Sequence, residues 1–364
     1  MVDLGSTDYM TVLATELSGS GSDFDVVTIK DVPGYATLVQ KNTLESLDDY
    51  ITDAGINLAD FNGITDQVTV DGSLYELPFR SDYWLIYYNK DVFDAAGIAY
   101  PSNDMTMEDY DALARQLTDT TYGSQVYGCH YHTWRSAVEL FGILDGKHSI
   151  LDGNYDWMIP YYDMILSEED DGVCQTYTDL STEGLHYSAA FSNGNVAMMN
   201  MGSWFISTLI SNLDSGEYDS SLCGNWGIAS YPHPDGAEAG STIATITGLA
   251  VTSASANKDA AFDFVNWVSG TEGAKVMAST GNFPAIMTDD VINTIAGMAG
   301  FPTDEGSKEA LNITNAYLEV PYAENVSEIN SILDTYHTSI MNREVTVEEG
   351  VASMNEQVGK ILNQ

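Results

Sequence analysis

Short apolar runs with strand character alternate with amphipathic runs along the whole of this chain. The run "FDVVTI" at 24–29 precedes the helix-like "VPGYATLVQ" at 32–40, and "WLIYYN" at 84–89 precedes "KDVFDAAG" at 90–97. Strands that alternate with helices in this way predict an α/β fold in which helices pack on a sheet. The chain has 364 residues, which is long for one hydrophobic core, so we expect two domains.

Further elements follow from caps, turns and periodicity. At the N-terminus we expect a strand over "MVDLG" and a helix over 6–21 that is capped by Ser6 or Thr7. "LYELPF" at 74–79 predicts a strand separate from 84–89, and residues from 241 predict a strand, a turn and a second strand before a helix from about Asn257. The C-terminal stretch 327–364 predicts helices.

Two helix starts are marked with particular clarity. Thr106 followed by Asp109 resembles a capping box, which predicts a helix over "TMEDYDALARQL". The apolar run "NVAMMNM" at 195–201 predicts a strand, and Gly202 and Ser203 then form a tight turn into a helix. Trp204 is expected in the first turn of that helix, where backbone N–H groups lack intrahelical partners.

The charge of the chain is strongly negative. Asp and Glu number 54 against 12 Lys and Arg, for a net charge of −42, and the acids are spread along the sequence. Nucleic acid is an improbable partner because phosphates must be neutralised by basic side chains. Anionic membranes and anionic ligands are disfavoured by the same repulsion, whereas a neutral ligand is not.

Motifs of common catalytic, metal and redox sites are missing. There is no phosphate-binding glycine loop, no HExxH and no G-x-S-x-G, so we expect no enzyme and no cofactor. "DGNYDW" at 152–157 starts like a calcium loop but lacks its later ligands, so we expect no metal. The three cysteines, Cys129, Cys174 and Cys223, fit no CxxC pattern, and one disulfide or three free thiols both remain open.

Aromatic residues are abundant, with 22 Tyr, 11 Phe and 6 Trp, many of them beside Gly, Ser, Asn or Asp. The C–H faces of sugars lie on flat rings and their hydroxyls bond to carboxylates and amides. A neutral polyol site is therefore compatible with this composition.

Four segments, read in order, resemble one family. They are 21–51 "GSDFDVVTIKDVPGYATLVQKNTLESLDDYI", 74–98 "LYELPFRSDYWLIYYNKDVFDAAGI", 191–205 "FSNGNVAMMNMGSWF" and 247–273 "TGLAVTSASANKDAAFDFVNWVSGTEG". Together they resemble the extracellular solute-binding proteins of ABC importers, in the carbohydrate-binding branch related to maltose-binding protein. The resemblance implies a two-lobed periplasmic-binding-protein fold of type II, with a hinge and a ligand cleft between the lobes.

The resemblance also implies a division of the chain. Residues 1–82 and 247–302 would form lobe 1, 83–246 would form lobe 2, and 303–364 would be C-terminal helices packed mainly on lobe 2. The hinges would lie around Arg80–Tyr83 and Ile246–Gly248. Family members usually carry a strand and a helix before "VDLG", so this N-terminal strand and helix, together with an export signal, are expected to be missing from the sequence.

By the same matching, Trp204 is expected to stack on a sugar. Asp31 follows a strand at a polar position of the cleft, although the alternative role as an N-cap of the next helix stays open. The remaining ligand-binding candidates are Lys30, Arg80, Tyr83, Trp134, Thr247, Asn282 and Phe283.

The resemblance implies a function and partners. A monomeric binding protein would capture a carbohydrate, an oligosaccharide in our interpretation, and deliver it to the permease subunits of an ABC transporter. It would be periplasmic or anchored at the cell surface as a lipoprotein. The alternatives are a glycoside hydrolase, which needs two carboxylates across a cleft, and a binding protein for another solute such as a polyamine, which needs acids in place of rings.

Overall fold

The computed structural model describes residues 2–5, 8–20, 23–61, 63–119 and 125–363. The chain divides into two compact units, which we describe separately. Unit 1 comprises 1–82, 244–295 and 320–330, and unit 2 comprises 83–243, 296–319 and 331–364. Neither unit is one continuous segment.

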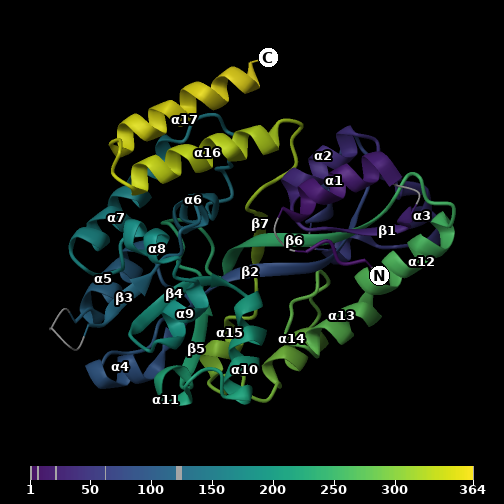
Figure 1. Ribbon diagram of the computed structural model, residues 1–364. Coiled ribbons are helices and arrows are strands. Elements are labelled where there is room, and N and C mark those ends of the chain that lie inside the picture. Colours follow the sequence, from purple (N-terminus) through teal and green to yellow (C-terminus); the bar gives the residue numbers. More distant parts are fainter. Residues whose placement is uncertain (1, 6–7, 21–22, 62, 120–124, 364) are drawn as a thin grey trace. The chain divides into compact units, whose positions relative to one another are not determined.

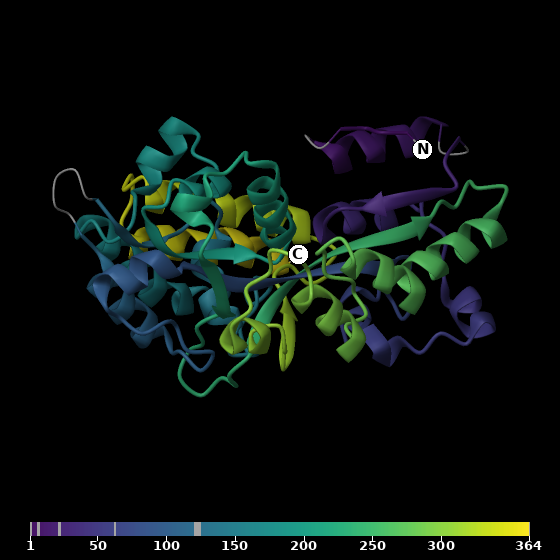
Figure 2. The same cartoon turned by 90° about the horizontal axis from the view of Figure 1, so that it is seen from below.

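Unit 1 combines a small sheet with helices on both sides of it. Strand β1 pairs antiparallel with the second half of β6, with Val26 opposite Val251 and Ile29 opposite Gly248. In Figures 1 and 2, α1 and α2 lie on one side of these strands and α12 and α13 on the other. The elements are α1 (Tyr9–Ser20), β1 (Val26–Ile29), α2 (Val32–Gln40), α3 (Asp48–Ala54), short 3₁₀ turns at Leu58–Phe61 and Thr65–Val68, the start of β2 (Leu77–Asn89), most of β6 (Ser241–Val251), α12 (Lys258–Ser269), α13 (Thr271–Ala278) and α14 (Asp289–Ala296).

Unit 2 is built on the second half of β2. This strand pairs antiparallel with β4 on one edge and β5 on the other, and β3 extends the sheet parallel to β4. All seven residues of β4 are buried, as expected for a central strand that is covered on both faces. The elements are α4 (Lys90–Ala96), α5 (Met107–Leu117), β3 (Tyr127–His130), α6 (Ser136–Ile143), a 3₁₀ turn at Asp156–Met158, α7 (Ile159–Asp170), α8 (Tyr177–Glu183), α9 (Tyr187–Ser192), β4 (Val196–Gly202), α10 (Trp204–Ser215), α11 (Ser220–Cys223), β5 (Trp226–Ser230), α15 (Glu305–Glu309), β7 (Asn315–Leu318), most of α16 (Val326–Met341) and α17 (Val347–Leu362).

Helix starts in unit 2 follow their sequence signals. Thr106 and Asp109 form the expected capping box of α5, because each side chain accepts a hydrogen bond from the backbone N–H of the other. Thr346 and Glu349 do the same for α17. In Figure 1, α16 and α17 lie side by side, and a Cβ added to Gly350 would lie 2.3 Å from the side chain of Ile340. Glycine therefore permits the close approach of these two helices.

The strands differ from the sequence-based prediction in three regions of the chain. "MVDLG" was expected to be a strand, but residues 2–5 join no ladder in the part of the chain that the structure describes. Strand propensity alone does not hold a strand without a hydrogen-bonded neighbour. The segments 74–79 and 84–89 merge into the single strand β2, and the two strands expected from 241 merge into β6. The proposed caps Ser6 and Thr7 lie outside the described residues.

The C-terminal part of the chain is divided between the two units. Residues 320–330 belong to unit 1, whereas the sequence division placed all of 303–364 in the C-terminal helices. Among the described helices, none combines the length and the apolar character that spanning a membrane requires.

Candidate functional site

The junction between β4 and α10 in unit 2 fixes the ring of Trp204. Gly202 lies opposite Trp84 in the β2–β4 ladder, and Ser203 N–H donates a 2.8 Å hydrogen bond to the carbonyl oxygen of Tyr83. A Cβ at position 202 would lie 2.0 Å from Cζ3 of Trp204. The indole thus lies directly against the backbone of Gly202, where only glycine leaves room for it.

Three tryptophans meet at this junction, and we call them the tryptophan cluster: Trp84, Trp134 and Trp204. The Trp84 ring is perpendicular to both neighbours, with centroid distances of 5.5 Å to Trp204 and 6.3 Å to Trp134. Trp134 and Trp204 are 6.3 Å apart with an interplanar angle of 57°. Edge-to-face rings attract each other in this distance range. Trp84 is 3% exposed and Trp134 is 40% exposed, so the cluster runs from the core to the surface.

Tyr187 and two histidines flank the tryptophan cluster. The Trp204 indole N–H donates to the Tyr187 hydroxyl at 3.2 Å, and the ring centroids of Tyr187 and Trp134 are 5.7 Å apart. His132 lies 4.5 Å from the Trp134 ring and 5.9 Å from the His186 ring, centroid to centroid. Burial, together with the neighbouring His186, lowers the pKa of His132 to about 4. His132 is therefore neutral at pH 7, and it adds a further uncharged ring to the tryptophan cluster.

Two buried polar atoms in this group lack a hydrogen-bond partner among the described residues. They are the indole nitrogen of Trp84 and Nδ1 of His132. Buried polar atoms are nearly always paired, so such orphans call for an explanation. Hydroxyl groups of a bound molecule or of water would satisfy both.

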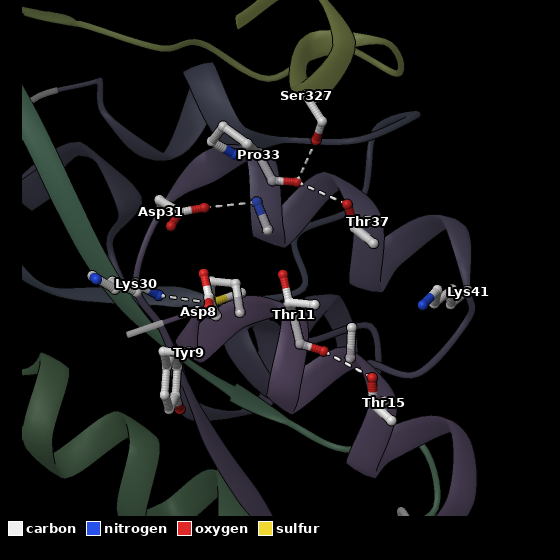
Figure 3. Close-up of a pocket in the computed structure, with 13 residues that line it drawn as sticks. Asp8, Tyr9, Thr11, Thr15, Lys30, Asp31, Pro33, Thr37, Lys41 and Ser327 are labelled. Carbon is white, nitrogen blue, oxygen red and sulfur yellow. Dashed lines mark hydrogen bonds between the residues drawn. The ribbon is translucent and has the colours of Figure 1, made fainter. Parts of the chain in front are cut away.

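In unit 1, Asp31 and Lys30 line a cavity of about 480 Å³ that is bounded by α1, α2 and the end of β1. Figure 3 shows Asp31 accepting the 2.7 Å hydrogen bond from the Gly34 N–H, which caps α2. The alternative that the sequence left open for Asp31, an N-cap, is therefore the role that the structure records. The threonines Thr11, Thr15 and Thr37 and the residue Lys41 also line this cavity.

Arg80 and the loop that carries Asn282 and Phe283 lie together in unit 1. Arg80 Nε forms a 2.5 Å ion pair with Asp82, and the Ser81 N–H donates to the carbonyl oxygen of Phe283 at 3.2 Å. Asn282 is half-buried and donates to Thr280. The Phe283 side chain is 0% exposed, so its ring offers no surface to a ligand in this structure.

A buried carboxyl group in unit 1 escaped sequence analysis. Glu76 is 1% exposed, and neither carboxylate oxygen has a hydrogen-bond partner in the described part of the chain. A Cβ on Gly248 would lie 2.1 Å from its Oε2, which places Glu76 beside β6 and next to the half-buried Thr247. Burial, with a smaller contribution from the nearby Asp31, raises the pKa of Glu76 to about 8. Nothing in "LYELPF" distinguishes this carboxylate from a solvent-exposed one.

The structure thus gathers the predicted residues into separate groups. Trp134 and Trp204 meet in unit 2, whereas the Tyr83 ring is 1% exposed and Trp84 occupies the place beside the other two indoles. Asp31 and Lys30 share one cavity of unit 1. Sequence reasoning missed Trp84, Tyr187 and His132. For Trp84, the only signal was the alternation of rings in "YWLIYY". This alternation assigns the rings to the two faces of a strand but does not say which face meets α10.

Comparison with known proteins gives a consistent result. Residues 1–275 match the family described as bacterial extracellular solute-binding protein. A sugar transporter of Rhizobium etli, solved in an open conformation, shares 47% identity and a TM-score of 0.90, covering 98% of this chain and 90% of that one. An ABC substrate-binding protein of Listeria monocytogenes in complex with cycloalternan has a TM-score of 0.79 at 22% identity, with 99% and 90% covered.

A curated relative is also similar. The mannitol-binding protein of Pseudomonas aeruginosa is 24% identical over 274 residues, which is 73% of this chain. The chain spans 61% of the length of that relative.

Proposed function

This chain belongs to the bacterial extracellular solute-binding proteins, and we propose that it captures a neutral carbohydrate for an ABC importer. The observation that carries the proposal is the tryptophan cluster, in which a half-exposed indole is held rigidly by two others. Rigid aromatic platforms with a few polar atoms are the usual surface for sugar binding. A cation or an anion finds no counter-charge among Trp84, Trp134, Trp204 and Tyr187.

The proposed contacts divide by unit. In unit 2, Trp134 and Trp204 stack on the sugar, and the unpaired Trp84 indole nitrogen and His132 Nδ1 belong to rings that contact Trp134. In unit 1, Asp31, Lys30, Arg80, Thr247 and Asn282 remain the predicted polar contacts. Tyr83 and Phe283 contribute to packing, since both rings are buried.

The relatives support this choice of ligand class. The Rhizobium etli protein is described as a sugar transporter, the Listeria monocytogenes protein holds cycloalternan, and the Pseudomonas aeruginosa protein is a mannitol-binding protein. Family and neighbours are binding proteins, and we propose that this chain is likewise a monomeric, non-enzymatic receptor. In our proposal it acts outside the cytoplasm, as a periplasmic protein or a surface lipoprotein, and meets the permease subunits of its transporter.

A thermal-shift screen tests the proposal. The full chain is melted with neutral mono- and oligosaccharides and sugar alcohols, and with polyamines and amino acids as controls. A ligand at 100 times its Kd adds about 2.7 kcal/mol to the unfolding free energy. We expect one sugar class to raise the Tm, Trp204→Ala to abolish that shift, and Trp267→Ala, an exposed tryptophan of unit 1, to retain it.

Two results would contradict the proposal. A shift with polyamines and none with sugars would replace the carbohydrate by a cationic solute. Turnover of aryl glycosides by the purified chain would show an enzyme.

A further inference from the structure

Two of the three cysteines lie next to a buried glutamate in the core of unit 2. Cys129 is on β3, Glu168 is on α7, and Cys174 follows that helix. Cys129 and Glu168 are 0% exposed, and Cys174 is 3% exposed. Their Sγ and carboxylate oxygen atoms all lie within 4.8 Å of one another. Side chains from three places in the sequence thus converge on one point.

The backbone holds this arrangement in place. The Cys129 N–H donates to the carbonyl oxygen of Val173 at 3.4 Å, and the Val173 N–H donates to the carbonyl oxygen of Glu168 at 2.8 Å. The segment 168–174 therefore turns back from α7 and runs beside β3.

Glu168 is the group that ordinary packing does not explain. Both of its carboxylate oxygens are buried, and neither has a hydrogen-bond partner of good geometry in the described part of the chain. The Tyr131 hydroxyl is a neighbour of Glu168 and of Cys129, and it too lacks a partner there. An unpaired buried carboxylate costs several kcal/mol, so it is retained only where something compensates it.

We propose that Cys129, Glu168 and Cys174 bind a divalent cation of the Zn²⁺ class. Two thiolates exclude Ca²⁺ and Mg²⁺, which take oxygen ligands, and favour a borderline-soft ion. Zn–S bonds of about 2.3 Å and Zn–O bonds of about 2.0–2.2 Å in a tetrahedron leave ligand atoms roughly 3.5–3.8 Å apart. That spacing fits within the observed limit. The Tyr131 hydroxyl, which neighbours Glu168 and Cys129, or a water molecule would supply the fourth ligand.

Binding is an exchange of Zn²⁺ for protons without any redox step. The two thiols each release one proton, and a protonated Glu168 releases a third. A disulfide between Cys129 and Cys174 is the competing explanation. It would account for the two sulfur atoms but would leave Glu168 without a partner, so the cation explains more of the structure.

The remaining cysteine provides a matched control. Cys223 is buried, like the other two, but its thiol lies near the carbonyl oxygen of Asp219 at 3.7 Å, in a different part of unit 2. Cys223→Ser thus removes one buried thiol and leaves the proposed ligands untouched. It reports what the loss of a buried sulfur does by itself.

The test measures metal and thiols on the full chain. After purification with Zn²⁺ and desalting, we expect about one zinc per chain by elemental analysis. We expect all three thiols to react with a thiol reagent once the chain is denatured with a chelator and without reductant. Co²⁺ should give the visible d–d bands of a tetrahedral site and a thiolate charge-transfer band.

Variants then assign the ligands. Cys129→Ser and Cys174→Ser are expected to lose the charge-transfer band or to weaken it strongly, Glu168→Gln to lower the Co²⁺ affinity at least tenfold, and Cys223→Ser to bind like the parent. The Co²⁺ spectrum and thiol count of the parent chain need no variant, so they decide the matter if a variant fails to fold. One reactive thiol in place of three would establish the disulfide, and three thiols without bound metal would leave no site. Either result overturns the proposal.

Discussion

The exposure of Trp134 gives a quantitative prediction for sugar binding. The residue is 40% exposed in a group whose other two indoles are more deeply buried. A tryptophan can bury up to about 250 Å², so a ligand can cover about 100 Å² of this ring. At about 25 cal/mol per Å², that contact contributes at most about 2.5 kcal/mol. We expect Trp134→Ala to raise the Kd of the cognate sugar by up to about 70-fold.

Isothermal titration calorimetry measures this effect. The parent chain, Trp134→Ala and Trp267→Ala are titrated with the sugar that gives the largest thermal shift. Trp267 is 55% exposed on α12 of unit 1, so its removal deletes a comparable surface elsewhere. A denaturation curve for each variant separates lost binding from lost folding. A Kd for Trp134→Ala within about twofold of the parent, from a folded variant, would refute the platform role.

Four further outcomes follow from buried groups and glycines. Because burial raises the pKa of Glu76 to about 8 from 4.5, its contribution to stability is fully present below pH 4.5 and is lost as pH rises through about 8. Urea denaturation at several pH values over that range should show that Glu76→Gln loses less unfolding free energy with rising pH than the parent does. The same pH dependence in both chains would contradict this. Burial lowers the pKa of His337 from 6.5 to about 3, so unfolding free energy is lost as pH falls from 6.5 through 3. His337→Gln should make the unfolding free energy less dependent on pH in that range. An unchanged pH dependence would refute this. Gly202→Ala should displace the Trp204 ring, change tryptophan fluorescence and cost about 1–3 kcal/mol in unfolding free energy, with an unaltered spectrum as the contrary result. Gly359→Ala on α17, where the added methyl meets no atom within 4 Å, should raise stability by about 0.5–1 kcal/mol in the same assay, and a loss would show an unrecognised contact.

Local signals predicted many of the elements. The capping box at Thr106 and the helix with Trp204 in its first turn are confirmed, and the strand predicted over 24–29 is found at 26–29. Each depends on residues within a few positions of one another. The strand expected over "MVDLG" is not found in the described residues 2–5, because a strand needs a ladder partner, which no local pattern supplies.

The candidate site was only partly accessible from the sequence. Trp204 could be singled out because a glycine stands two residues before it. The side of β2 that faces α10 depends on the register that sets Trp84 opposite Gly202, and register is a tertiary property. The same holds for Cys129, Glu168 and Cys174, since the fold of segment 168–174 beside β3 brings them together.

The interleaving of the two units has a consequence for how the protein is made. Unit 1 includes residues 320–330, and unit 2 includes residues 331–364, which come after them in the chain. Unit 1 is therefore still incomplete when most of unit 2 has been synthesised, so the two units cannot fold one after the other in the order of the sequence. A chain that is exported before it folds meets the same condition, because all of its segments arrive before either core closes. Truncations at 82 or 243 would leave an incomplete core on each side, so separate expression of one unit requires rejoining its segments by new loops.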